Sequence, residues 1–232
     1  MTSIKINNIL KNKATKAKAE RQASFFKTGP GEYSAHDKFM GVTVPEIRVV
    51  IAEHRDLPED EISKLLDSPW HEARMAGLLI MVHQFRTGDT ATQKRIYSLY
   101  TRRFDAVNNW DLVDNTASQI AGAWLHGKSH APLFKWARSK DLWTRRIAIV
   151  ACHYDIKLKK FDSFLKITKN NISETHDLMH KATGWMLREA GKVDIGVLRG
   201  FLDEHAGVMP RTMLRYAIEK LPERERKNYM KK

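Results

Sequence analysis

The sequence contains a single cysteine, Cys152, among its 232 residues. One cysteine excludes an internal disulfide framework and any zinc site built on several cysteines, and it suits a reducing compartment. No apolar run approaches the roughly 20 residues that a membrane span needs. The opening segment MTSIKINNILKNKATKAKAERQ also lacks the apolar stretch of a signal peptide. We therefore expect a soluble, cytoplasmic protein with no membrane partner.

Glycine and proline are scarce, at 12 and 7 residues, and the alternation typical of β-strands is almost absent. Helical spacing of small and apolar residues recurs instead in four long segments: Trp70–Phe85, Trp110–Leu125, Leu142–Leu158 and Leu178–Val193. Shorter amphipathic segments occupy Pro45–His54, Glu59–Leu66, Ala91–Phe104, Pro132–Arg138, Phe161–Ile167 and Val197–His205. With 42% hydrophobic and 29% charged residues, the chain can bury a core, so the sequence predicts an all-α protein.

The long segments recur at a regular interval. Trp70, Trp110 and Trp143 each stand at the start of one, 40 and 33 residues apart. A helix-pair period of this size is typical of an α-solenoid, in which the second helices of the pairs line a concave surface. We expect one such domain over residues 1–232, with N-terminal helices and a loop in residues 1–40. Residues 27–42 form the one long Gly-bearing loop. A compact helical bundle with coincidental spacing is the alternative.

Positive charge is in excess, with 40 Lys and Arg against 27 Asp and Glu and a formal net charge of +13. Such a balance favours a polyanionic partner, most often nucleic acid, although a solvated basic surface is the simpler alternative. Part of the excess lies in the two tails. Other basic residues lie inside apolar segments that should be folded: Arg145, Arg146, Lys181, Arg188, Arg211 and Arg215.

The segment from Asn108 to Asn115 is the strongest candidate for a reactive site. On a helix, Trp110 and Asp114 are four residues apart and share a face, while Leu112 and Val113 would turn toward the core. An indole beside a carboxylate can hold a cation. The simpler interpretation makes Asp111 a helix cap and Trp110 a packing residue.

Two later helices carry further candidates. Of the neighbours Arg145 and Arg146, one is expected to face a groove and contact phosphate, because adjacent residues point about 100° apart on a helix. Gly184 lies in mid-helix and predicts close approach by another helix or by a ligand. His176 and His180 have metal-ligand spacing, but the segment lacks a motif for a metal site, and no phosphate loop or dinucleotide fingerprint is present. We expect neither a metal nor a cofactor.

Three motifs together resemble those of a known family. They are Trp110-Asp111-x-x-Asp114, Leu142-Trp143-x-x-Arg146-x-Ala148 and Gly184-Trp185-x-Leu187-Arg188-Glu189. Their order and spacing are similar to those of the DNA alkylation repair family, the alkylpurine DNA glycosylases of the AlkD type. The resemblance extends from about Gly41 to the C-terminal helices. It implies a superhelix of HEAT-like repeats with a basic concave face that binds duplex DNA, and hydrolysis of the N-glycosidic bond of cationic N3- and N7-alkylated purines.

The resemblance also assigns roles to residues. It implies that Asp114 is the catalytic carboxylate, that Trp110 and Trp185 pack on the sugar and backbone of the damaged nucleotide, and that Arg146 contacts phosphate. Asp111 matches an acidic family position without an assigned role. From charge and motif together we expect further DNA contacts at Arg145, Lys181, Arg188, Arg215 and Arg48.

Other functions remain open at the level of sequence. Relatives of such a fold can bind DNA structures without excising bases. A protein-binding solenoid would carry its charge incidentally, and an RNA-binding repeat protein would prefer single strands. The leading hypothesis is a monomeric glycosylase acting on alkylated duplex DNA, with a DNA-structure-binding protein as the alternative.

Overall fold

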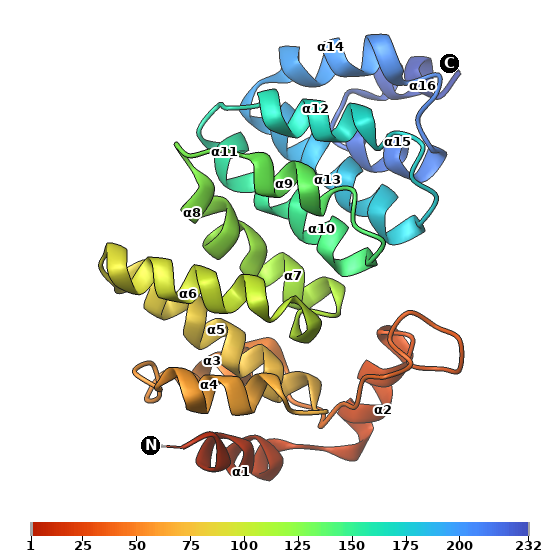
Figure 1. Cartoon of the computed structure of the whole chain (residues 1–232). Coiled ribbons are helices and arrows are strands. Elements are labelled where there is room, and N and C mark those ends of the chain that lie inside the picture. The colour runs from red at the N-terminus through yellow and green to blue at the C-terminus, as the bar shows by residue number, and fades with distance from the viewer. Residues whose placement is uncertain (1, 232) are drawn as a thin grey trace. The chain divides into compact units, whose positions relative to one another are not determined.

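The computed structural model describes residues 2–231, and its regular secondary structure consists of helices (Figure 1). Within those residues no strand forms, and one isolated bridge pairs Lys38 with Trp70. The all-α prediction is therefore confirmed. No helix in the described range is long and apolar enough to cross a membrane. Internal contacts divide the chain into two units, residues 1–116 and 117–232.

The first unit is built around one central helix. Its elements are α1 (Ser3–Lys13), α2 (Lys16–Phe25), α3 (Val44–Ile51), α4 (Glu59–Leu66), α5 (His71–Thr87), α6 (Thr90–Arg102), the short 3-10 helix η1 (Phe104–Ala106) and most of α7 (Trp110–Ala117). The helices α1, α3, α4 and α6 all pack against α5. Because α5 is enclosed on most sides, it buries residues around its circumference, from His71 to Phe85.

The second unit continues the helical chain. It begins with the π-helical turn η2 (Ser118–Gly122) and α8 (Ala123–Leu125), which follow α7 directly. Its other elements are α9 (Ala131–Trp136), α10 (Leu142–Ala151), α11 (His153–Lys157), α12 (Asp162–Asn170), α13 (Asp177–Val193), α14 (Ile195–His205), α15 (Arg211–Ile218) and α16 (Glu223–Lys231).

Helices of the second unit form two layers. One layer is a row in which η2 packs on α10, α10 on α13, and α13 on α15. The other layer holds α9, α12 and α14, of which α9 and α12 pack on α10, and α14 packs on α13 (Figure 1). Each long helix of the row therefore buries its apolar face between neighbours, as the recurring spacing of apolar residues predicts.

The predicted helical segments all form. The segment at 110–125 contains the π-helical turn η2, and the segment at 142–158 divides into α10 and α11 at Cys152. Residues 27–42 form the expected loop between α2 and α3. Side-chain caps fix several helix starts: the Asp141 carboxylate accepts the N–H of Thr144 at 2.6 Å, and the Asp89 carboxylate accepts that of Thr92 at 2.8 Å.

Close packing of α13 against α15 requires glycine at position 184. A Cβ atom at this position would collide with the carbonyl oxygen of Met213 and the Cβ of Tyr216, both on α15. A Cβ atom at Gly122 would likewise collide with the carbonyl oxygen of Ala151 in α10. The mid-helix glycine at 184 therefore lets the α13 and α15 backbones approach closely, and of the two explanations that the sequence offered, helix–helix packing accounts for it.

Gly184→Ala should lower the free energy of unfolding by about 1–3 kcal/mol, because the obstructing atom is a backbone carbonyl that moves only with its helix. Gly200→Ala on α14 is the matched control, since a Cβ there meets nothing within 4 Å. Alanine should stabilise that site by up to about 1 kcal/mol through helix propensity. Urea unfolding of both variants measures the difference. If both substitutions changed the free energy of unfolding equally, close helix packing would not explain the glycine at position 184.

Candidate functional site

The start of α7 places Trp110 and Asp114 on one face of the helix. Both side chains are half-buried, whereas Leu112 and Val113 between them are fully buried in the core. The helical spacing predicted this division. Asn109, itself buried, fixes the first turn because its side-chain oxygen accepts the N–H of Trp110 at 2.8 Å.

An aromatic stack supports the Trp110 indole. Phe26 lies between two rings: its centroid is 5.0 Å from that of Trp110 and 4.9 Å from that of Phe39, and both pairs are stacked. Phe25 meets the edge of the indole at 5.7 Å and is 65% exposed. Trp110 therefore packs against Phe25 and Phe26 at the end of α2, Phe39 of the 27–42 loop supports Phe26 from behind, and Phe25 extends the aromatic surface to solvent.

His71, the first residue of α5, lies beneath this stack. Its ring stacks on Phe39 at 4.6 Å and lies 5.3 Å from Phe26. Nδ1 lies 3.2 Å from the Asp37 carboxylate of the loop, and Nε2 lies 2.9 Å from the Asp111 carboxylate of α7. Since a carboxylate only accepts hydrogen bonds, two such partners favour a doubly protonated, cationic imidazole.

The charges of this cluster stabilise one another. Burial alone would lower the pKa of His71, but the negative charges and hydrogen bonds of Asp111 and Asp37 raise that pKa to about 9. Burial alone would raise the pKa of Asp37, but hydrogen bonding to His71 and the positive charges of Arg74 and His71 lower it to about 2. Arg74 completes the cluster through an ion pair with Asp37 and a hydrogen bond to Asn108.

Glu72 holds the second half of the loop. Its carboxylate accepts the backbone N–H groups of Met40, Gly41 and Val42 at 2.9, 2.8 and 3.2 Å. Gly41 has φ of 91°, and a Cβ there would collide with the carbonyl of Thr15, so glycine is required. Adjacent residues of α5, His71 and Glu72, therefore anchor the 27–42 loop.

This arrangement gives Asp111 a role that the motif left open. Its carboxylate is buried: one oxygen accepts the N–H of Leu112 in the first turn of α7 at 2.8 Å, and the other binds His71. Asp111 therefore satisfies a backbone group at the helix start, as the cap interpretation expected, and in addition joins α7 to α5. His71, Asp37 and Arg74 were missed by sequence reasoning. His71 is 34 residues from Asp37 and 40 residues from Asp111, and helical periodicity gives no information about pairs so far apart. The one visible sign was the charged sequence His-Glu-x-Arg at the start of an otherwise apolar helix.

Arg48 is exposed on α3 and reaches α7, where it donates a hydrogen bond to the Asn115 side-chain oxygen at 3.1 Å. It therefore lies beside the residue that follows Asp114. Trp110, Asp114 and Arg48 all belong to the first unit, whereas the other predicted site residues belong to the second.

In the second unit, Arg145 and Arg146 both bind protein groups. Arg146 is 5% exposed and donates from Nη1 to the Leu178 carbonyl of α13 at 2.6 Å. Arg145 pairs with Glu174 at 2.8 Å and donates to the carbonyl of Lys140. Their guanidinium groups link α10 to the start of α13 and to the turn that precedes it.

Trp185, Lys181 and Arg188 lie along α13. The half-buried Trp185 donates from Nε1 to Glu189 at 3.0 Å, and Lys181 pairs with Asp177 at 2.7 Å. Arg188 pairs with Glu219.

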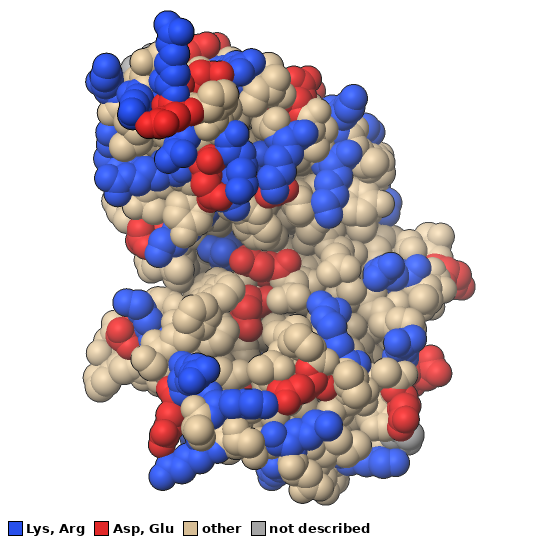
Figure 2. All heavy atoms as spheres, turned by 180° about the vertical axis from the view of Figure 1, so that it is seen from behind, with Lys and Arg blue, Asp and Glu red and all other residues tan. Residues whose placement is uncertain are grey.

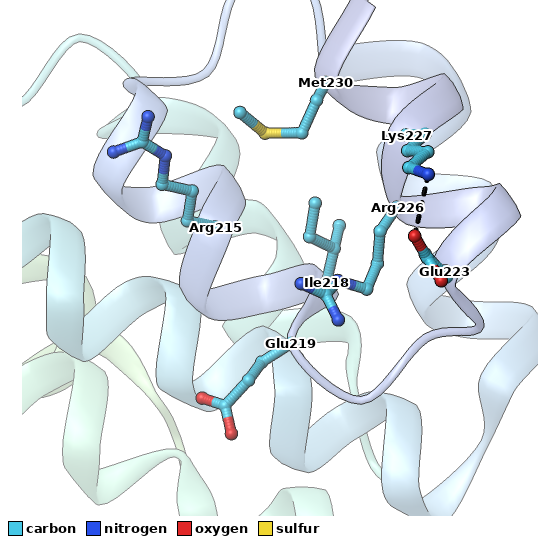
Figure 3. Close-up of a pocket in the computed structure, with 7 residues that line it drawn as sticks. All are labelled: Arg215, Ile218, Glu219, Glu223, Arg226, Lys227 and Met230. Carbon is cyan, nitrogen blue, oxygen red and sulfur yellow. Dashed lines mark ion pairs between the residues drawn. The ribbon is translucent and has the colours of Figure 1, made fainter.

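Arg215 is exposed on α15 and lines a groove of about 430 Å³ against α16. Figure 3 shows its guanidinium at one side of the groove, with Ile218 and Met230 nearby and Glu219 directed away. Lys227 and Glu223 form an ion pair at 2.7 Å on the opposite side.

The two units differ in charge. Residues 117–232 hold 23 Lys and Arg against 12 Asp and Glu, whereas residues 1–116 hold 17 against 15. Lys and Arg side chains gather over the upper part of Figure 2, which belongs to the second unit, with some acidic residues among them. The positive excess of the chain is therefore concentrated in the second unit. Among residues 2–231, no group of three or more His, Cys, Asp or Glu side chains has the arrangement to hold a metal ion.

Comparison with known proteins identifies the family. A family profile described as DNA alkylation repair enzyme matches residues 6–221. The chain belongs to the DNA alkylation repair enzyme family. Family membership supports a role in alkylation repair, with DNA as the partner and enzymatic activity implied by the family description.

A solved structure shares the fold of this family member. It is described as a predicted DNA alkylation repair enzyme from Enterococcus faecalis and is 15% identical in sequence. The match has a TM-score of 0.71 and covers 90% of this chain and 97% of the other. No curated protein matches in sequence. At this identity, the similarity to the solved structure bears on the fold alone.

The His71 cluster should make the stability of this repair-family protein depend on pH. Because the pKa of His71 is raised to about 9 from its ordinary 6.5, its contribution is fully present below pH 6.5 and is lost as the pH rises through 9. His71→Gln should abolish this decrease in stability between pH 6.5 and 9. At pH 6 the variant should have a free energy of unfolding about 3 kcal/mol lower than the wild type, since two buried carboxylates lose their counter-charge.

Denaturant unfolding of both proteins between pH 6 and pH 10 measures this dependence. The matched control is His83→Gln on the same helix, because the His83 ring makes no ion pair with any residue in 2–231. The control should follow the wild-type curve. If the free energy of unfolding depended on pH in the same way for wild type and His71→Gln, the His71 imidazole would not be charged in the folded protein.

Proposed function

We propose that the protein is a DNA glycosylase that hydrolyses the N-glycosidic bond of cationic N3- and N7-alkylated purines in duplex DNA. The observation that carries the proposal is the Trp110–Asp114 pair, half-buried on one face of α7 in a member of the DNA alkylation repair enzyme family. A carboxylate beside a supported indole has the chemistry to stabilise a cationic sugar.

The reaction needs little assistance at the leaving group. A purine alkylated at N3 or N7 is already cationic, so it departs without a strong general acid. Bond cleavage leaves positive charge on the deoxyribose, as in glycoside hydrolysis generally. The Asp114 carboxylate would stabilise that charge and direct a water molecule to C1′, and the Trp110 indole face would add cation–π attraction and exclude bulk water.

The second unit would supply DNA binding. We assign Trp185 to packing on the sugar and backbone of the damaged nucleotide, and Arg146 to the neighbouring phosphate. The remaining backbone contacts are assigned to Arg145, Lys181, Arg188, Arg215 and Arg48. The positive excess of residues 117–232 supports this assignment, because phosphate binding is driven largely by counterion release.

The proposed architecture is a solenoid of HEAT-like helix pairs forming a single, monomeric domain with a basic concave face. The row of η2, α10, α13 and α15, backed by a second layer, supports this arrangement. In such a solenoid the damaged nucleotide would be read along an open surface. Bulky lesions should then be accepted, because the base need not enter a deep pocket.

Asp114→Asn tests the chemistry. The variant should bind methylated duplex DNA like the wild type but lose release of 7-methylguanine by about 100-fold or more, because an amide cannot provide the stabilising charge. Binding is measured by fluorescence anisotropy and release by chromatography. Asp56→Asn, an exposed carboxylate of the same unit, is the matched control and should retain full release. Undiminished release by Asp114→Asn would remove Asp114 from the mechanism.

The alternative function is recognition of DNA structure without base excision. The burial of Arg146 and its hydrogen bond to the Leu178 carbonyl favour this alternative, since that guanidinium is already engaged by protein. A protein of this kind would bind branched or distorted duplexes with strong salt dependence and leave every alkylated base in place.

A further inference from the structure

A second cluster of reactive side chains lies in the second unit, apart from the residues assigned to DNA. It lines a cavity of about 430 Å³ between the loop that follows α8, the end of α11 and the start of α12. Ser163, His130 and Asp155 all belong to its lining. None of these residues belongs to the three family motifs, and the proposed glycosylase chemistry does not use them.

One hydrogen bond and one ion-pair contact join these three side chains. The hydroxyl of Ser163 lies 2.7 Å from Nδ1 of His130, and Nε2 of His130 lies 3.2 Å from Oδ2 of Asp155. Asp155 is 8% exposed, and its other oxygen lies 2.6 Å from Nδ1 of His126. Ser163 and His130 are half-buried and therefore accessible from the cavity.

The contact with Asp155 favours one protonation state of the imidazole. The negative charge of the Asp155 carboxylate, 3.2 Å from Nε2, stabilises a proton on that nitrogen. Nδ1 is then the lone-pair nitrogen, and the Ser163 hydroxyl donates to it. A hydroxyl hydrogen-bonded to an imidazole whose other nitrogen lies against a buried carboxylate has the order of groups of a nucleophilic triad, here with the two imidazole nitrogens exchanged relative to serine proteases.

We propose that Ser163, His130 and Asp155 form a second catalytic site that hydrolyses small carboxylic esters. Ser163 is the nucleophile, His130 the general base and acid, and Asp155 the residue that orients His130. The inference is independent of the glycosylase proposal.

The cavity supplies the other requirements of acyl transfer. Ser163 is the second residue of α12, and the backbone N–H groups of a helix's first turn have no intrahelical partners, so they are available to stabilise an oxyanion there. Leu133 and Phe164 provide buried apolar walls, and the exposed Lys159 and Lys160 stand at the rim. These residues suit an ester with a short apolar acyl group and an anionic end.

Cys152 lines the same cavity but is poorly suited to act as the nucleophile. Cys152 is 3% exposed, and burial, reinforced by the negative charge of Asp155, raises the pKa of its thiol to about 12. It therefore remains a neutral thiol at physiological pH, and its Sγ donates to the Ala148 carbonyl.

The proposed reaction has two balanced steps. The Ser163 oxygen attacks the ester carbonyl carbon while its proton passes to Nδ1 of His130; the C–O bond to the alcohol breaks, and the alcohol leaves with that proton. Water then attacks the acyl-serine, giving one proton to His130, which returns it to the Ser163 oxygen as the carboxylic acid departs. The net change is ester plus water to acid plus alcohol.

Labelling by an alkyl fluorophosphonate, which phosphonylates activated serines, tests the proposal directly. Intact-mass spectrometry of the full chain should show one adduct, and peptide mapping should place it on Ser163. Ser163→Ala should remain unlabelled, whereas Ser129→Ala, an exposed serine in the preceding loop, should label like the wild type. Hydrolysis of 4-nitrophenyl acetate should follow the same pattern.

His130→Asn should reduce both labelling and ester hydrolysis by about 100-fold or more, since the base is lost while Ser163 remains. Circular dichroism checks that each variant is folded. An unlabelled wild-type protein, an adduct on another residue, or ester hydrolysis that persists in Ser163→Ala would each overturn the proposal.

Discussion

The interaction on which the first unit depends is the buried imidazole of His71 held between two carboxylates. It joins three segments that are remote in sequence: the 27–42 loop through Asp37, the start of α5, and the first turn of α7 through Asp111. Removing a charge of this kind leaves its partners buried and unpaired, which is more costly than the loss of a surface pair. The position of Trp110 follows, because the stack of Phe39 and Phe26 on the His71 ring supports its indole.

The two aspartates of the Trp-Asp-x-x-Asp motif illustrate how surroundings decide the role of a side chain. Asp111 is 6% exposed and holds the cationic His71, so it serves the structure. Asp114, one turn later, is half-buried on the face of Trp110. The two aspartate side chains, three residues apart, thus differ in their exposure to solvent. Only Asp114 is exposed enough to act on the damaged sugar as proposed.

Much of the fold could be predicted because helical spacing is a local property. α4 was predicted with the bounds that the structure has, Glu59–Leu66, and the shared face of Trp110 and Asp114 followed from their positions on one helix. The π-helical turn η2 has no marker in composition. The His71 cluster and the Ser163–His130 contact join residues more than 30 positions apart, and periodicity within one helix carries no information about such pairs.

Release of the damaged base by the wild-type protein tests the central claim most directly. A duplex containing one 7-methylguanine is incubated with excess protein, and free base and abasic sites are quantified by chromatography and strand cleavage. The account predicts one free 7-methylguanine for each abasic site and no product from the undamaged duplex. Tight, salt-sensitive binding that leaves the methylated base attached would contradict it and identify a DNA-structure-binding protein.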